Sequence, residues 1–268
     1  MNLEFFIPAN KALQKYIEGY YFIAANNEAG LLNYWTFPNN FFILSISQNI
    51  DIVIEEKKLV VKPGSQENIV VNYVASYTKP IEVVYEEPVN EITIYFKPLG
   101  INQFIENTEP LFKDKNAANF IPFPDFTAQM KQIFSLENRT AQTEALEKYW
   151  LSKLLDKQPS ILENVLADVE ADLRIDDIAT KYNFSRQYLH KLFIKNIGKS
   201  PVEYRKIHRF RNSIITQKRA ASLTQVTYDN SFYDQSHFIK DFKQFTNINP
   251  HSFFRKVDTA KENVWLFI

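Results

Sequence analysis

The feature that most constrains this chain is a pair of similar segments, residues 175–204 and 223–254. Each contains a short helix with apolar periodicity, a tight corner and a longer helix. An internal repeat of this kind decides the architecture before any single element does. The unit has the build of a helix-turn-helix, whose second helix is shaped to enter a DNA major groove. With one extra residue in the second corner, the apolar positions coincide as follows: Ile178 with Val226, Ala179 with Thr227, Phe184 with Phe232, Leu189 with Phe238, Phe193 with Phe242, and Pro201 with Pro250.

In the first unit, Ser185 stands where the longer helix needs an N-cap, because its hydroxyl can accept a hydrogen bond from a free backbone N–H. Helical spacing then predicts one buried face and one mostly polar, basic face. The predicted buried residues are Tyr188, Leu189, Leu192 and Phe193, and the outward residues are Gln187, His190, Lys191 and Ile194.

The second unit repeats this arrangement with Asp234 as the predicted N-cap. Three phenylalanines at helical spacing, Phe238, Phe242 and Phe245, form the predicted buried stripe. The residues expected to point away are Tyr233, Ser236, His237, Lys240 and Gln244.

Together these motifs resemble the DNA-binding domain of the AraC/XylS family of transcriptional regulators, over about 85 residues. The matching positions are Ile178-Ala179, Phe184-Ser185, Leu189 to Phe193, Gly198-Lys199-Ser200-Pro201 with Tyr204-Arg205, Phe232 to Lys243, and Pro250. Three residues depart from the family pattern: Thr227 replaces the usual Ala, and Ser231 and Asn247 replace the usual Gly. Asn is the next best residue after Gly for a left-handed backbone, so the last departure is mild.

The helix faces, in agreement with the positions that the family uses, predict two classes of DNA contact. Gln suits the edge of adenine and Lys suits the edge of guanine, whereas contacts to phosphates fix register without reading sequence. The predicted base-reading residues are Gln187, His190 and Lys191 in the first unit and Gln235, Ser236 and Lys240 in the second; the predicted phosphate contacts are Arg186, Lys195, Arg209 and Lys243.

A net charge of zero conceals a strong asymmetry. Residues 171–255 contain 15 Lys and Arg against 7 Asp and Glu, a balance of +8, so the remainder carries −8. A basic module of this size is typical of a surface that neutralises phosphates. The interpretation is therefore a sequence-specific regulator that binds double-stranded DNA, with RNA polymerase as a further partner if it activates transcription.

Residues 202–218, between the two units, are predicted to form one helix of about 17 residues, roughly 25 Å long at ~1.5 Å per residue. Such a spacer suits two recognition helices that enter successive major grooves, ~34 Å apart. Its cations Arg205, Lys206, Arg209 and Arg211 either contact phosphates or are simply solvated.

The N-terminal half shows seven short apolar runs bounded by turn residues: 33–38, 41–47, 50–56, 58–63, 68–76, 80–87 and 90–98. They predict a small β-sandwich or barrel. Before them, Leu13, Tyr16, Ile17, Tyr20 and Tyr21 indicate a helical stretch. The family resemblance implies a cupin-like barrel that senses an effector. The alternative is a regulator without a small-molecule ligand, whose β-domain serves only dimerisation or partner binding.

An enzyme is disfavoured because the chain has no cysteine and its four histidines, His190, His208, His237 and His251, all lie in the C-terminal half. The β-domain therefore lacks imidazole and thiolate groups for metals or nucleophiles, and we expect no cofactor. The adjacent carboxylates at 55–56 and 86–87 would point to opposite faces of a strand. Several aromatic residues either line a ligand pocket or fill the core: Trp35, Phe37, Phe42, Tyr73, Tyr77, Tyr85 and Tyr95.

Residues 123–171 are predicted to be helical, with Leu146, Trp150, Leu154 and Leu155 on one stripe of helix 140–156. This stripe either packs on the barrel or pairs two chains in a homodimer. We expect a β-rich domain with trailing helices at 1–156, a DNA-binding domain at 157–258 and an apolar tail at 259–268 that packs back or stays exposed. With no long apolar run and no leader-like N-terminus, the expected location is the cytoplasm, associated with the nucleoid when DNA is bound.

Overall fold

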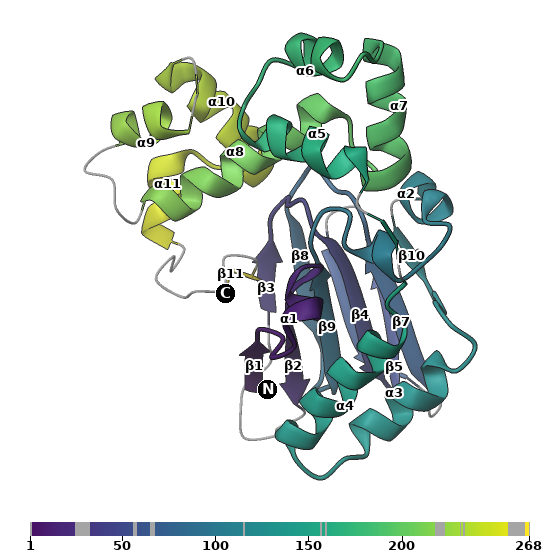
Figure 1. Ribbon diagram of the computed structural model, residues 1–268. Helices are drawn as coiled ribbons and strands as arrows, with labels where there is room; N and C mark the ends of the chain where they lie inside the picture. Colours follow the sequence, from purple (N-terminus) through teal and green to yellow (C-terminus); the bar gives the residue numbers. More distant parts are fainter. Residues whose placement is uncertain are drawn as a thin grey trace.

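A computed structural model describes residues 2–24, 33–55, 58–64, 68–114, 116–155, 157–158, 160–217, 223–230, 232, 234–256 and 266–267. The N-terminal part is a two-sheet sandwich with helices on one side, and the C-terminal part is a group of helices stacked on one end of it (Figure 1). This arrangement confirms the predicted combination of a β-rich domain and an all-α domain.

The larger sheet, called sheet A, has the strand order β1-β2-β9-β4-β7-β10, and the smaller one, sheet B, has the order β11-β3-β8-β6-β5. All neighbours pair antiparallel except β6 and β8, which are parallel. Sheet A comprises β1 (Asn2–Phe6), β2 (Ile17–Ala24), β9 (Glu91–Phe96), β4 (Phe42–Gln48), β7 (Ile69–Val74) and β10 (Asn116–Ala118). Sheet B comprises β11 (Leu266–Phe267), β3 (Asn33–Thr36), β8 (Ile81–Tyr85), β6 (Lys58–Pro63) and β5 (Ile50–Ile54).

All seven predicted strands are present, as β3 to β9, but the predicted helix through Tyr21 is wrong. The helix α1 (Lys11–Gln14) spans only four residues, and β2 begins at Ile17. The apolar spacing was ambiguous because β2 lies between two strands and is covered on both faces, so nearly all its residues are apolar. A central strand of this kind lacks the alternation that would distinguish it from a buried helix.

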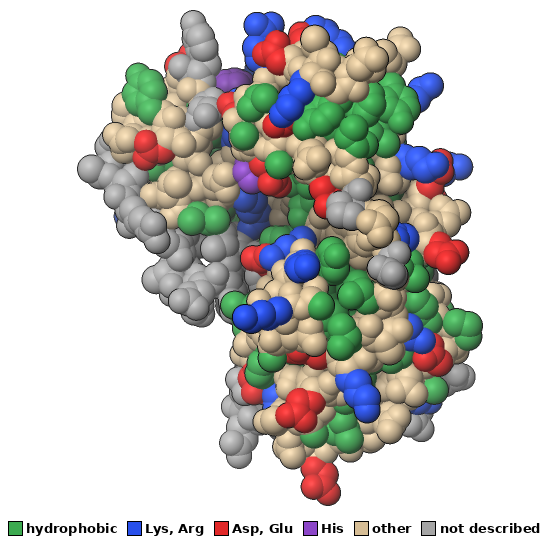
Figure 2. Space-filling view, viewed as in Figure 1, with side chains coloured by type: hydrophobic (Ala, Val, Ile, Leu, Met, Phe, Trp, Pro, Cys, Tyr) green, Lys and Arg blue, Asp and Glu red, His purple; other side chains and the backbone are tan. Residues whose placement is uncertain are grey.

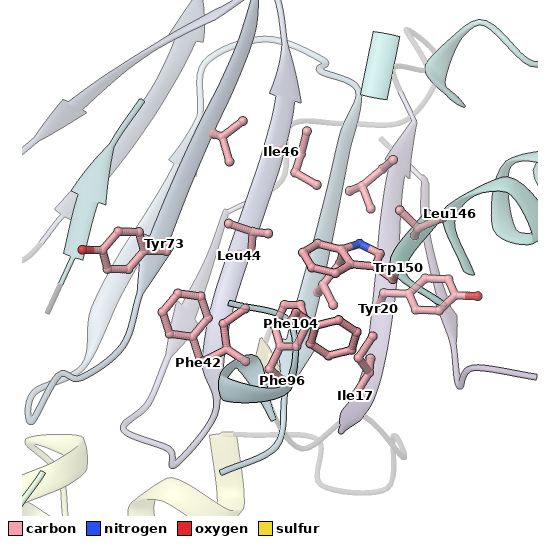
Figure 3. Packing of buried hydrophobic residues seen from close by; sticks show 14 of the residues in the cluster. Ile17, Tyr20, Phe42, Leu44, Ile46, Tyr73, Phe96, Phe104, Leu146 and Trp150 are labelled. Atoms are coloured by element: carbon pink, nitrogen blue, oxygen red, sulfur yellow. The ribbon is translucent and has the colours of Figure 1, made fainter. Parts of the chain in front are cut away.

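Both faces of sheet A are buried, as the alternating residues of β9 illustrate. Ile92, Ile94 and Phe96 face a core shared with helices, whereas Glu91 and Tyr95 face sheet B. The first core is closed by the short helix η1 (Ile101–Gln103), α3 (Phe126–Phe134) and α4 (Arg139–Ser152). Figure 3 shows Trp150 of α4 over the sheet, beside Phe96 and Phe104. The centroid of the Trp150 ring lies 5.0 Å from that of Phe96 and 5.3 Å from that of Phe104.

The packing of α4 decides how its apolar stripe is used. Leu146 and Trp150 are buried against the sheet, and Leu154 packs at the edge of the same core. On the opposite side of the helix Glu144 and Lys148 are exposed. The apolar stripe of this helix therefore stabilises the sandwich within one chain.

The C-terminal part contains α5 (Ile161–Glu170), α6 (Ile175–Lys181), α7 (Arg186–Ile197), α8 (Pro201–Gln217), α9 (Leu223–Asp229), α10 (Gln235–Thr246) and α11 (Pro250–Lys256). The 17 residues of α8 confirm the predicted long connecting helix. One core joins α5, α6 and α7 to the start of α8 through Tyr204, and another joins α9, α10 and α11 to its later turns through Phe210 and Ile214. The first of these groups also contacts α2 (Glu109–Asp114) of the N-terminal part.

The C-terminal tail returns to the sandwich, since Leu266 and Phe267 pair with Thr36 and Trp35 at the edge of sheet B. The rest of the predicted tail region lies outside the described residues. Within the described ranges, no helix is both long and apolar enough to span a bilayer.

Candidate nucleic-acid interface

The first helix-turn-helix unit consists of α6 and α7 and has the predicted caps. The Ser185 hydroxyl accepts a hydrogen bond from the backbone N–H of Tyr188 at 3.1 Å. At the other end Gly198, with φ 76°, ends α7 in the left-handed conformation that Gly adopts without strain. These two caps fix the length of the helix at 12 residues.

The buried face of α7 is narrower than predicted. Leu189, Phe193 and Ile197 form one fully buried row, but Tyr188 is 51% exposed, so its predicted burial is wrong. The Tyr188 ring packs at the corner against the Phe184 ring, with centroids 4.8 Å apart. The small core beneath α7 fully buries one row of side chains at i, i+4 and i+8, and Leu192 packs half-buried beside that row. Gln187, His190 and Lys191 remain exposed.

The second unit, α9 and α10, has the same caps built from other residues. The Asp234 carboxylate accepts a hydrogen bond from the backbone N–H of His237 at 2.7 Å, and Asn247 ends α10 at φ 61°. The predicted stripe of Phe238, Phe242 and Phe245 is buried. Two departures from the family pattern are thus accommodated, since Asn247 adopts the left-handed conformation and the buried Thr227 hydroxyl donates to the carbonyl of Leu223 at 2.8 Å. Ser231 and Tyr233 lie outside the described residues.

Gln235, Ser236 and Lys240 are all exposed on α10. His237 is only half-buried and lies 3.8 Å from the carboxylate of Asp241, one turn further along the helix. Both units therefore present a short, capped helix with polar or basic side chains available to a partner.

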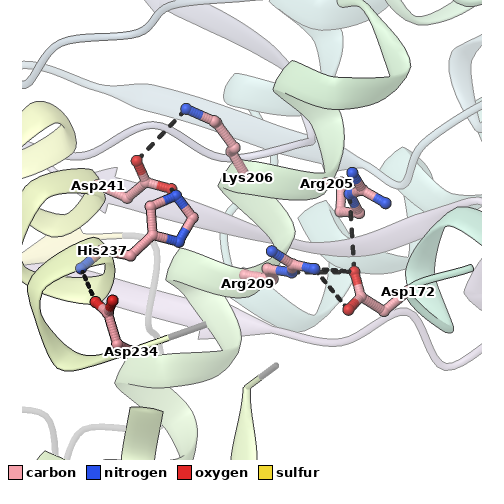
Figure 4. Close-up of polar contacts among 7 residues, drawn as sticks. All are labelled: Asp172, Arg205, Lys206, Arg209, Asp234, His237 and Asp241. Atoms are coloured by element: carbon pink, nitrogen blue, oxygen red, sulfur yellow. Dashed lines mark hydrogen bonds and ion pairs between the residues drawn. The ribbon is translucent and has the colours of Figure 1, made fainter. Parts of the chain in front are cut away.

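Two carboxylates attach the units to α8, and we call these contacts the linker ion pairs (Figure 4). Asp172, between α5 and α6, accepts hydrogen bonds from Arg209 at both oxygens, one of them at 2.6 Å, and lies 3.7 Å from Arg205. Asp241 of α10, whose side chain is 4% exposed, lies 3.4 Å from the ammonium of Lys206. The connecting helix thus holds one unit through its arginines and the other through its lysine.

These pairs change the interpretation of the predicted phosphate contacts. The Arg209 side chain is 19% exposed and its guanidinium is engaged by Asp172, which favours a positioning role over a phosphate contact. Arg186 and Lys195 remain exposed on α7, although each has a carboxylate neighbour, Asp176 and Glu109 respectively. Lys243 is exposed on α10.

Cations of the C-terminal part also bind main-chain carbonyls of the sandwich, and no sequence motif predicts these contacts. Arg211 of α8 donates to the carbonyls of Phe37 and Pro38, the latter at 2.7 Å. Lys199, only 1% exposed, donates to the carbonyl of Ala75 at 2.8 Å. Burial lowers the pKa of the Arg211 guanidinium, opposed by the neighbouring Tyr77 and Tyr95. Beside these contacts a crevice of about 420 Å³ separates α8 from the sandwich (Figure 2).

The aromatic residues expected to line a pocket or fill the core divide between both roles. Tyr77, Tyr85 and Tyr95 line a cavity of about 90 Å³ between sheets A and B. Phe42 and Tyr73 belong to the helix-covered core, and Trp35 is 41% exposed. Phe37 packs against Phe253 of α11, with ring centroids 5.1 Å apart, so it joins the two parts of the molecule.

The described residues contain no group of three metal-ligating side chains. Of the paired carboxylates, Glu86 and Glu87 are both exposed and follow the end of β8. The described residues thus provide two candidate sites. One is the exposed faces of α7 and α10, which suit a polyanion, and the other is the cavity between sheets A and B.

Comparison with known proteins agrees with this geometry. A family model described as "Helix-turn-helix domain" matches residues 178–256. The chain is 31% identical over 88 residues to the Msm operon regulatory protein of Streptococcus mutans, covering 32% of each chain. It is 29% identical over 82 residues to the uncharacterized HTH-type transcriptional regulator YdeC of Bacillus subtilis, covering 30% of this chain and 28% of that one. The matches therefore span about a third of these relatives.

Among solved structures, ToxT of Vibrio cholerae O395 bound to (E)-4-(8-methylnaphthalen-1-yl)but-3-enoic acid covers 88% of this chain and 97% of its own, at 14% identity and a TM-score of 0.46. This identity and this TM-score are too low to indicate that the two proteins bind the same ligand.

The two capped units on one connecting helix define a tandem helix-turn-helix protein. Within that class, residues 178–256 are a helix-turn-helix domain of the AraC type.

Proposed function

We propose that this protein is a sequence-specific, double-stranded DNA-binding transcriptional regulator. The observation that carries the proposal is the pair of N-capped helices, α7 and α10, each exposing polar and basic side chains and each belonging to a unit that is attached to α8. In this proposal Gln187, His190 and Lys191 read one groove, and Gln235, Ser236 and Lys240 read the next. Arg186, Lys195 and Lys243 contact phosphates, whereas Arg209 positions the first unit.

We further propose that an effector acts through the N-terminal domain. Support comes from a short connection between the interior cavity and α8. The Tyr77 hydroxyl, at the cavity, donates to the carbonyl of Phe37 at 2.6 Å, and Arg211 of α8 donates to the same carbonyl. A ligand that moves Tyr77 would therefore change an acceptor that holds the DNA-binding part.

The alternative is a regulator whose β-domain serves only dimerisation or binding of a protein partner. The apolar stripe of α4 does not favour it, since that stripe packs within the chain. A homodimer through α4 would have to use its exposed side, which carries Glu144, Lys148 and Leu151. Contact with RNA polymerase follows only if the protein activates transcription.

Selection of bound duplexes from a random pool by the purified full chain tests the proposal. We expect enrichment of a site with two segments about one helical turn, ~10 bp, apart. Lys191→Ala should weaken that site by about 1 to 3 kcal/mol and relax base preference in one segment. Lys131→Ala, on the exposed side of α3 at the far end of the sandwich (Figure 1), is the matched control and should change neither. Recovery of no preferred sequence, or loss of binding by the Lys131 variant alone, would contradict the assignment.

A further inference from the structure

The cavity between the two sheets surrounds a carboxylate that no other part of the proposed function uses. Glu91, the first residue of β9, is buried in this cavity of about 90 Å³. Four hydroxyls donate to it: Tyr21 at 3.2 Å, Thr93 at 2.8 Å, Ser47 at 3.0 Å and Tyr85 at 3.0 Å. Among the described residues, no Lys, Arg or His lies within ion-pair distance of Glu91. A buried carboxylate held only by neutral groups still lacks a compensating charge.

The direction of these hydrogen bonds determines what the cavity offers a ligand. Each carboxylate oxygen receives two of the four hydrogen bonds, so the donors are directed toward Glu91. Because Tyr21 and Thr93 donate to Glu91, their oxygens accept from the hydroxyls of Tyr34 at 3.4 Å and Ser45 at 2.7 Å, and each of the four donor oxygens keeps a further lone pair as an acceptor. A wall rich in acceptors and bearing a negative charge favours a ligand with N–H or O–H donors and a positive charge.

The remaining lining adds two constraints. Five tyrosines line the cavity, and aromatic rings around an enclosed site favour organic cations through their π electrons. They are Tyr21, Tyr34, Tyr77, Tyr85 and Tyr95. The Asn72 amide also lines it, and its buried Nδ2 has no hydrogen-bond partner among the described residues. A ligand hydroxyl would satisfy that amide.

Size limits the ligand to a few heavy atoms. An apolar cavity of about 150 Å³ holds one benzene molecule. At about 90 Å³ this cavity suits a smaller compound. Lining residues Ile52, Leu59 and Val74 are only half-buried, so entry is expected along β5, β6 and β7.

We propose that this cavity binds a small organic ammonium compound, such as an amino alcohol, with Glu91 as its anionic anchor and the tyrosines as its walls. The inference rests on the proposed effector response and names the chemical class of the effector.

Binding should depend on pH in a defined direction. Burial raises the pKa of Glu91 above its ordinary value of 4.5, opposed by its hydroxyl donors, and a cation needs the ionised form. Affinity should therefore fall as the pH is lowered through the pKa of Glu91. The neighbouring tyrosines stay neutral in this range, because burial raises the pKa of Tyr21, Tyr34, Tyr77, Tyr85 and Tyr95 above 10.

The test is calorimetric titration of the full chain with ethanolammonium, trimethylammonium and tetramethylammonium chlorides, against sodium chloride at equal ionic strength and the neutral compounds ethylene glycol and tert-butanol. We expect saturable binding of at least one ammonium compound, at least tenfold tighter than its neutral counterpart. This comparison uses the unaltered protein, so its outcome does not depend on whether a variant folds. No saturable ammonium binding, or equal binding of a neutral compound, would overturn the proposal, and stronger binding of ethylene glycol would indicate a polyol site.

Two variants examine the anchor. Glu91→Gln keeps the shape without the charge and should lose at least tenfold in ammonium affinity and the pH dependence. Glu87→Gln removes the same charge from an exposed residue outside the cavity and should retain the affinity. Unchanged ammonium affinity in Glu91→Gln would refute the role of Glu91. DNA binding is measured separately on the same samples, so a protein that binds its DNA site but no ammonium compound refutes this inference alone, and one that selects no DNA refutes the proposed function.

Discussion

The two helix-turn-helix units have the same length of recognition helix but different attachments. The first is held from two sides. Asp172 pairs with Arg209 of α8, and Lys199 and the cap at Gly198 contact the N-terminal part, where an added Cβ at residue 198 would meet Phe112 at 3.1 Å. The second is held mainly by α8, through Lys206 and a cluster of phenylalanines, with Phe37 as its contact with the sandwich.

This difference indicates how a signal from the N-terminal domain would reach DNA. The first unit should follow the sandwich as nearly one body, whereas the second should follow α8. Because Arg211 of α8 and the cavity-lining Tyr77 share the carbonyl of Phe37, a change at the cavity should alter the second unit relative to the first.

The largest expected effect comes from the core of the second unit. Phe242 packs against the rings of Phe210, Phe238, Phe253 and Phe254, so Phe242→Ala should lower the free energy of unfolding by about 3 to 5 kcal/mol. Hydrogen exchange should show lost protection in α9 to α11 with α5 to α7 retained. Equal loss in both units would mean that they unfold together and that the attachments do not differ.

The linker ion pairs come next. Lys206→Met leaves Asp241 buried without its cation and should cost about 1 to 3 kcal/mol, less than the ~3 to 5 kcal/mol of a fully buried pair because Lys206 is partly exposed. Asp172→Asn leaves Arg209 and Arg205 without their carboxylate, but their side chains are 19% and 20% exposed, against 4% for Asp241. The free energy of unfolding should therefore fall by about 1 kcal/mol or less. Urea denaturation of both variants measures the order, and the reverse order would contradict this account of how each unit is held.

Much of this architecture could be predicted from the sequence because local chemistry determines it. Ser185 and Asp234 cap their helices, the phenylalanines of α10 are buried, and the seven strands β3 to β9 lie where short apolar runs occur. Failures occurred where distant packing decides the outcome. Tyr16 to Tyr21 have apolar spacing that fits a helix or a doubly covered strand, and only the neighbours β1 and β9 select the strand.

In the candidate site too, local sequence predicts some features and distant packing decides the others. Exposure of Gln187, Lys191 and Lys240 follows from helix periodicity, and their contacts with DNA remain predictions. The partners of Arg209, Arg211 and Lys199 lie 37, 174 and 124 residues away in the sequence. No local pattern distinguishes a cation that binds a phosphate from one that binds a distant carboxylate or carbonyl.

Arg209 therefore offers a sharper test of the first unit. As a positioning residue, Arg209→Met should weaken DNA binding by about 1 kcal/mol while leaving the dependence of log affinity on log salt concentration unchanged. A phosphate contact would instead flatten that slope by about one. Lys243→Met, on the exposed side of α10, is the matched variant and should flatten the slope. A flattened slope for Arg209→Met would restore the phosphate contact and weaken the role given to Asp172.

The smallest effects come from the two helix ends, which share a left-handed backbone but differ in their surroundings. Asn247→Gly should stabilise the protein by about 0.5 kcal/mol, because Gly adopts φ 61° without the steric cost that Asn retains. Gly198→Asn should cost more, about 1 kcal/mol or above, since its new Cβ would also meet the Phe112 ring at 3.1 Å. Urea denaturation measures both changes in the free energy of unfolding, provided that its slope with urea concentration is the same for the two variants and the unaltered protein. Equal and opposite changes would show that Phe112 does not press on the first cap, and that the sandwich holds the first unit no more firmly than the second.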